Sequence, residues 1–94
     1  MFAINQEDSG ELHLSGRLDA ASAPEARRYF DEIQTTCRLD FTELDYIASV
    51  GLGLLAAAQK RLMGSGNGLI LAGLNPHLRE VFSLAGFEGI FEFE

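Results

Sequence analysis

The first sixteen residues contain a short apolar run and a short alternating run, with a polar stretch between them. Residues 2–4 are apolar, and residues 11–16 place Leu12 and Leu14 on one face, as a half-buried strand does. The polar run between them contains Gly10 and predicts a turn. We therefore expect an antiparallel hairpin at the start of the chain.

A repeat of apolar positions at three- and four-residue steps then replaces the alternation and predicts a helix within residues 18–36. Ser22 and Glu25 have the spacing of a capping box at the start of this helix. Pro24 is tolerated in the first turn, because a missing backbone N–H costs no intrahelical hydrogen bond there. The apolar stripe consists of Ala26, Tyr29, Phe30 and Ile33.

The middle of the chain predicts a short strand, a polar turn and a second helix. Residues 37–41 are the strand, which we expect to end within residues 40–42. A polar turn then leads to a helix with Ser49 in the N-cap position, and the glycine-rich residues 64–68 end it. The apolar stripe of this helix consists of Leu52, Leu55, Ala56, Gln59, Leu62 and Met63.

The last third of the chain predicts a strand, a helix and a final strand. Residues 69–72 are apolar on both faces, which is typical of a strand that helices cover on a parallel sheet. The third helix has Asn75 as its N-cap, Pro76 at its first position and Gly86 beyond its end. Residues 89–94 alternate again and predict the last strand.

The order of elements is therefore β-β-α-β-α-β-α-β, which predicts one α/β domain over residues 1–94. The strand–helix–strand units late in the chain imply parallel pairing with right-handed connections. Together with the N-terminal hairpin, they predict a small mixed β-sheet.

Composition and charge narrow the range of possible binding partners. No apolar run approaches the roughly 18–20 residues of a membrane-spanning helix, so we expect no direct membrane insertion. The N-terminus has neither a basic start nor an apolar signal core, and we expect a cytoplasmic protein. The net charge of −7 disfavours nucleic acid and anionic membrane surfaces, and it favours a basic protein surface as the partner.

Side chains with catalytic or metal-binding chemistry are sparse. Cys37 is the single cysteine, so it forms no internal disulfide, and we interpret it as a structural thiol. His13 and His77 lie far apart, and neither has a cysteine or a second histidine at metal-ligand spacing, so we expect no metal site. The chain lacks a phosphate-binding loop of the G-x-x-x-x-G-K type. We expect no cofactor and no enzymatic activity.

The junction at residues 47–53 is the most distinctive local feature. The first N–H groups of a helix lack intrahelical acceptors and lie at its partly positive end, which can hold a phosphate or a carboxylate. Gly51 and Gly53 remove side chains from the start of this helix, so that another backbone could approach closely. In the alternative interpretation, Ser49 only caps the helix and the two glycines only pack.

Four short motifs occur in order along the chain. They are Gly16-x-Leu18-Asp19, the strand end Leu39-Asp40, Tyr46-Ile47-x-Ser49-x-Gly51-Leu52, and Gly73-Leu74-x-Pro76. With the sequence around them they resemble the STAS domain family, which includes the anti-sigma factor antagonists and the cytoplasmic domains of sulfate transporters. The resemblance covers essentially the whole chain. It implies a small mixed sheet with helices on one side, in agreement with the order of elements.

The resemblance also implies a role for the junction. In family members that act in partner switching, the junction reads Asp-Ser-Ser/Thr-Gly, and an anti-sigma factor that is also a kinase phosphorylates the second hydroxyl residue. The unphosphorylated form binds that partner and frees the sigma factor. In this chain the acid position is Ala48, the first serine is Ser49, the phosphoacceptor position is Val50 and the glycine is Gly51.

The chain departs from this pattern at two positions. Ala48 has no carboxylate and Val50 has no hydroxyl, so we expect no phosphorylation at Val50. Ser49 is an alternative acceptor, although as an N-cap its oxygen would be held by a backbone N–H. Either the chain binds its partner constitutively, or its regulation comes from elsewhere, such as abundance or a ligand.

The resemblance therefore implies a non-catalytic interaction module in transcription regulation, which binds an anti-sigma factor or a histidine-kinase-like ATPase. An alternative is an accessory subunit of an ABC-type lipid transport system, bound to the transporter ATPase subunit. A homodimer through a phenylalanine face at the C-terminal sheet edge is left open. We expect Asp40 and Asp45 to lie in loops near the edge that carries Asp19. The expected partner-binding residues are Asp19, Ala48, Ser49, Val50, Gly51, Leu52 and Gly53.

Overall fold

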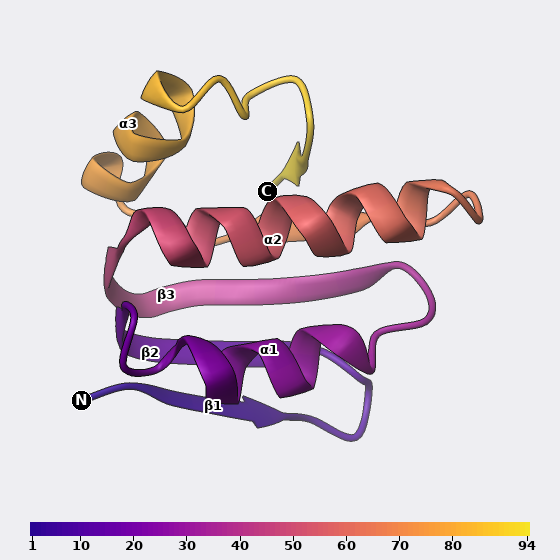
Figure 1. The fold of residues 1–94 in the computed structure, drawn as a ribbon, viewed down its shortest axis with the longest axis horizontal. Coiled ribbons are helices and arrows are strands. Elements are labelled where there is room, and N and C mark those ends of the chain that lie inside the picture. Colours follow the sequence, from indigo (N-terminus) through magenta and orange to yellow (C-terminus); the bar gives the residue numbers. More distant parts are fainter.

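The computed structural model describes all 94 residues, Met1 to Glu94, as one five-stranded sheet with three helices (Figure 1). It confirms the predicted order of strands and helices. β1 pairs antiparallel with β2, and the pairs from β2 to β5 are parallel, so the sheet is mixed. The elements are β1 (Ala3–Gln6), β2 (Leu12–Leu18), α1 (Ala23–Asp31), β3 (Cys37–Ile47), α2 (Ser49–Met63), β4 (Leu69–Ala72), α3 (Pro76–Leu84) and β5 (Glu92–Phe93).

All three helices lie on one face of the sheet. The strands follow one another across it in chain order, so each connection from β2 onward moves by one strand in the same direction. Right-handed connections then put α1, α2 and α3 on the same side. Figure 1 shows α1 and α2 side by side over the sheet, with α3 beyond α2. No helix covers the opposite face, which we call the open face.

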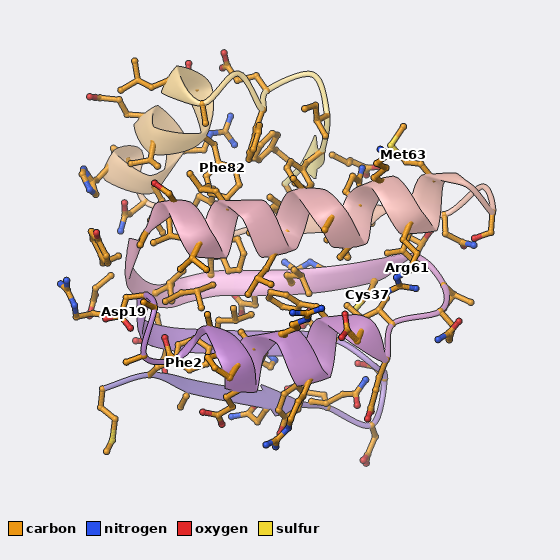
Figure 2. All side chains as sticks on the ribbon, in the orientation of Figure 1. Phe2, Asp19, Cys37, Arg61, Met63 and Phe82 are labelled. Carbon is orange, nitrogen blue, oxygen red and sulfur yellow. The ribbon has the colours of Figure 1, made fainter.

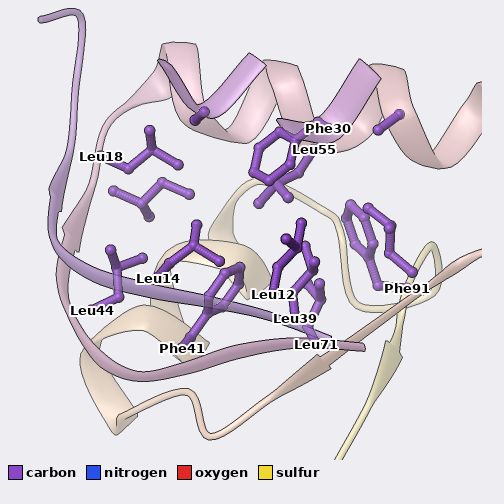
Figure 3. Close-up of a cluster of buried hydrophobic side chains, with 14 of the residues drawn as sticks. Leu12, Leu14, Leu18, Phe30, Leu39, Phe41, Leu44, Leu55, Leu71 and Phe91 are labelled. Carbon is purple, nitrogen blue, oxygen red and sulfur yellow. The ribbon is translucent and has the colours of Figure 1, made fainter. Parts of the chain in front are cut away.

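The core fills the layer between the sheet and the helices (Figure 3). Strands β2 and β3 supply its floor, and Phe30 of α1 and Leu55 of α2 close it. Burying one leucine or phenylalanine side chain stabilises a fold by about 1.5–3 kcal/mol, so this layer holds the hairpin, the parallel strands and the helices together. The largest fully buried side chains are Phe30, Phe41, Phe82, Leu12, Leu14, Leu18, Leu39, Leu44, Leu55, Leu62, Leu69 and Leu71.

Phe82 anchors α3 and the C-terminus in an aromatic cluster. Its ring centroid lies 6.4 Å from that of Phe41 and 6.0 Å from those of Phe91 and Phe93, and the last two contacts are edge-to-face. Phe91 is buried, and Phe87 and Phe93 pack half-buried against the same core. The C-terminal edge therefore does not expose a phenylalanine face. The last strand is shorter than predicted, because residues 88–90 form a turn.

β3 is longer than the sequence predicts. It has 11 residues and continues through Ile47, so the expected polar turn after residue 42 is wrong. The pairing of β2 with β3 shifts register twice, between His13 and Ser15 and between Gly16 and Arg17, and β3 has one extra residue at each shift. Such bulges break the alternation of buried and exposed side chains, so the polar residues resemble a turn in the sequence.

Candidate protein-docking site at the start of α2

The start of α2 follows β3 without a loop. Ala48 is extended, with φ −91° and ψ 170°, and occupies the N-cap position. Its N–H donates to the carbonyl of Leu18 (2.9 Å), and its carbonyl accepts from the N–H groups of Gly51 (2.9 Å) and Leu52 (3.1 Å). Two neighbouring parallel strands thus end together, and this fixes the direction in which α2 leaves the sheet.

The predicted N-cap, Ser49, is wrong by one residue. Ser49 is the first helical residue, its side chain is exposed, and its hydroxyl does not cap the helix. A cap side chain can reach the N–H groups of the first turn only from the extended residue before the helix, and that residue is Ala48. The Ser49 oxygen is therefore not held by a backbone N–H of the helix, contrary to the expectation for an N-cap serine.

The two glycines of the junction differ in their surroundings. Gly51 is buried, and a Cβ atom built there would lie 2.8 Å from side-chain atoms of both Leu18 and Ile47. Packing therefore explains Gly51, as the alternative interpretation holds. Gly53 is exposed, and a Cβ atom there would have no other atom within 4 Å. Glycine costs about 1 kcal/mol relative to alanine inside a helix, and no contact within the chain requires it at this position.

The outer side of α2 is apolar and exposed. Val50 is 41 % exposed, Gly53 and Ala57 are exposed, and Leu54 is half-buried. These four residues follow the i, i+3, i+4, i+7 spacing of a single helical stripe, which we call the α2 face. Leu54 and Ala57 also line a groove of ≈ 360 Å³ between α1 and α2.

The sequence prediction missed Leu54 and Ala57, although one signal was present. Residues 49–59 contain no charged side chain, whereas a surface helix of a globular protein normally carries charges on its outer side. Apart from Met63, which is 58 % exposed, the predicted stripe of this helix covered only buried and half-buried positions. Of the predicted contact residues, Leu52 is half-buried and Gly51 lies beneath the surface, so neither is part of the α2 face.

Asp19 lies at the same end of the sheet as the start of α2, as Figure 2 shows. Its Oδ1 accepts from the N–H groups of Ala21 (3.0 Å) and Ser22 (3.3 Å), and its carbonyl accepts from Ala23 (2.9 Å). Asp19 therefore forms the turn that starts α1. Its Oδ2 lies 4.0 Å from Nε of Arg17, the charged side chain nearest to it.

The predicted capping box at Ser22 is wrong. The Ser22 hydroxyl does not cap α1, because it turns back to the end of β2. There it donates to the carbonyl of Arg17 (2.9 Å) and accepts from the N–H of Asp19 (3.0 Å). The hydroxyl thus closes the turn before the helix and makes no hydrogen bond to the N–H groups of the first helical turn.

Asp40 and Asp45 do not lie in loops, because the longer β3 includes both. Asp40 is on the open face, where its Oδ1 accepts from Oγ1 (2.6 Å) and N (2.9 Å) of Thr42. Partial burial raises the pKa of Asp40, but the Thr42 hydrogen bonds and the nearby His13 outweigh it, and the net pKa is lowered. The structure thus places Asp40 away from the start of α2.

The chain belongs to the STAS family. A family model described as "Mlab, STAS domain" matches residues 2–92. The anti-sigma-B factor antagonist of Listeria monocytogenes is 31 % identical over 91 residues, which cover 93 % of this chain and 80 % of that protein. BtrV of Bordetella bronchiseptica, provisionally named an anti-sigma factor antagonist, is 37 % identical over 82 residues, or 83 % of this chain and 71 % of BtrV.

Solved structures agree on the fold. An anti-sigma factor antagonist from Mycobacterium paratuberculosis superimposes with a TM-score of 0.82 at 22 % identity, over 99 % of this chain and 83 % of that one. The chain is thus a STAS domain that resembles anti-sigma factor antagonists. None of its helices has the length and apolar character to cross a membrane.

Proposed function

We propose that this STAS domain is a non-catalytic binding module that acts in the cytoplasm and docks an anti-sigma factor or a histidine-kinase-like ATPase through the α2 face. The exposed, uncharged side of α2 carries the proposal, with Val50 at the position where the family pattern has a phosphoacceptor. Exposed apolar area beside a shallow groove is the usual anchor of a protein contact. Acidic residues elsewhere on the chain, which has a net charge of −7, favour approach to a basic partner.

We further propose that the module binds without a phosphorylation switch. Val50 offers no hydroxyl, and Ala48 offers no carboxylate beside it. The Ser49 hydroxyl is exposed, but it lies one residue earlier, about 100° around the helix axis from Val50. A kinase active site aligned with position 50 would therefore not meet it. Because Val50 cannot be phosphorylated, the α2 face stays in the form that binds the partner.

The binding experiment compares two exposed apolar residues. Val50→Glu places a charge in the proposed contact, whereas Leu84→Glu places the same charge on α3, where Leu84 is 81 % exposed. Calorimetry with a histidine-kinase-like ATPase of the anti-sigma factor type from the same organism should show at least about 30-fold weaker binding for Val50→Glu, equivalent to about 2 kcal/mol. Leu84→Glu should bind like the wild type. Equal affinities for the two variants would contradict the proposed face.

The switch experiment uses intact-mass measurement after incubation with the same ATPase and ATP. The wild-type chain should gain no phosphate, and the double variant Ala48→Asp/Val50→Ser should gain one. A phosphate on wild-type Ser49 would overturn the constitutive mode while leaving the α2 face intact. No phosphate on the double variant would show that the partner is not a kinase of this kind.

A further inference from the structure

The open face of the sheet carries a cluster that the docking function does not use. His13 projects from β2 away from the core, between carboxylates from two other segments. Its Nε2 lies 3.0 Å from Oε2 of Glu7 and 3.6 Å from Oε1 of Glu11. Its Nδ1 lies 3.0 Å from Oδ2 of Asp40. The imidazole is therefore surrounded by three carboxylates.

The β1–β2 turn brings the two glutamates together. The N–H of Glu7 donates to the carbonyl of Glu11 (2.9 Å), so the two residues face each other across the turn. One ligand atom from each glutamate and one from His13 all lie within 4.8 Å of one another. The sequence prediction of no metal site considered only cysteine and histidine spacings, and these carboxylates are oxygen ligands that the hairpin supplies.

The geometry around Nε2 of His13 is that of a ligand set. This atom is shielded from solvent and makes no hydrogen bond, although Glu7 Oε2 is only 3.0 Å away, so the oxygen lies off the N–H direction. Two ligands of one metal ion, each about 2.1 Å from it, lie about 3.0 Å apart at a right angle and about 3.4 Å apart at the tetrahedral angle of zinc. The separation and the off-axis position of Glu7 both fit that arrangement.

The ligands are held in place by neighbouring groups. Asp40, which receives two hydrogen bonds from Thr42, lies against Nδ1 of His13, as the outer carboxylate of a carboxylate–histidine–metal arrangement does. Arg38 hydrogen-bonds Oε2 of Glu11, so Oε1 remains directed towards His13. Arg38 is also bound to Glu94 (2.7 Å), which limits its movement.

The charge balance of the cluster favours a cation. Glu7, Glu11 and Asp40 bring three negative charges, and Arg38 contacts only one of them.

We propose that Glu7, Glu11 and His13 bind one divalent transition-metal ion on the open face, with Asp40 positioning the imidazole. One imidazole with two carboxylates suits zinc or manganese better than magnesium or calcium, which prefer oxygen ligands alone. The site ties the β1–β2 turn to β2. It is independent of the docking proposal, because the open face and α2 lie on opposite sides of the sheet.

The test is a calorimetric titration of chelator-treated protein with zinc chloride, with magnesium chloride as a comparison. The wild type should bind one zinc ion per chain and no magnesium. Glu7→Gln and His13→Asn should each weaken zinc binding by at least about 10-fold, and Asp40→Asn by about 10-fold. The matched controls are His77→Asn, which removes the other histidine, and Asp8→Asn, which removes a neighbouring charge of the same turn. Both should bind zinc like the wild type.

A second measurement guards against an unfolded variant. Without zinc, His13→Asn and Glu7→Gln should give the wild-type far-UV circular dichroism spectrum. With zinc, the melting temperature should rise for the wild type and Val50→Glu but not for His13→Asn, because an ion that binds only the folded chain stabilises it. Absence of zinc binding, or its loss in His77→Asn with retention in His13→Asn, would overturn the proposal.

Discussion

The α2 face and the open face present surfaces of opposite character on the two sides of one sheet. On the α2 face, Val50, Gly53 and Ala57 are exposed and uncharged, and no packing contact requires a glycine at position 53. On the open face, the polar side chains around His13 and Arg38 are paired with one another. An exposed apolar surface is suited to bind a macromolecule, whereas charged side chains already held close together are suited to bind a small ion. Under the two proposals, the faces therefore serve different partners.

The largest expected effect tests how firmly the start of α2 is seated on the core. Gly51→Ala puts a Cβ atom 2.8 Å from Leu18 and Ile47, so these side chains or the helix must move. We expect the free energy of unfolding to fall by about 1–3 kcal/mol, as for other overpacked cores. Urea unfolding followed by circular dichroism measures it. An unchanged midpoint would mean that the junction can shift freely, and the α2 face would then not be a fixed surface.

The matched substitution two residues later should have the opposite sign. Gly53→Ala adds a methyl group in open space and removes backbone freedom from the unfolded chain, so stability should rise by about 0.5–1 kcal/mol. If a partner backbone approaches this position, the same variant should bind it more weakly. Greater stability with unchanged affinity would place the contact elsewhere on α2.

A smaller effect is expected on the open face. Arg38→Ala removes the ion pairs with Glu11 and Glu94, all at least partly exposed. Exposed ion pairs contribute little and are screened by salt. The loss of stability should therefore be smaller than for Gly51→Ala and should shrink further in 1 M sodium chloride, as the same urea titration would show. A salt-independent loss as large as that of Gly51→Ala would indicate that the open face takes part in the core.

The smallest effect concerns Cys37, the first residue of β3, which packs half-buried against the edge of the core. Its thiol is half-buried with Sγ 3.4 Å from the carbonyl of Gly10, and burial raises its pKa. The folded chain therefore retains this proton at pH values where the unfolded chain loses it. The contribution of Cys37 to stability should be constant below pH 8 and decline slightly above about 8.5, the ordinary thiol pKa. A matching decline in Cys37→Ala would assign the effect to another group.

The sequence predicted the elements better than their ends. The hairpin, the Asn75 cap and most positions of the apolar stripes are local patterns that the structure confirms, with Asn75 Oδ1 accepting from the N–H of Leu78 (2.8 Å). The exceptions are Met63, which is 58 % exposed, and Ile33, which is buried but lies beyond the end of α1. The caps at Ser22 and Ser49 were wrong, because capping depends on which residue is extended before the helix. The length of β3 was wrong because its bulges depend on how β2 pairs with it.

The candidate sites, too, were predicted only where the signal is local in the sequence. The junction was recognisable from its motif, but only the fold separates buried Gly51 from exposed Gly53. The carboxylates around His13 were missed because the sequence analysis considered only cysteine and histidine spacings. Asp40 in addition reaches His13 only through strand pairing between residues distant in the chain. Contacts set by register cannot be deduced from a single sequence by periodicity alone.

The one-sided arrangement of the helices has a consequence for how such a chain can change over time. Outward positions of β2 and β3 touch no helix, so substitutions there leave the buried leucines undisturbed. Residues of α2 must pack against the core on one side of the helix and form the proposed binding surface on the other. Outside the cluster around His13, sequence drift should therefore be rapid on the open face and slow along α2, so new specificities for small ligands can arise without loss of the fold.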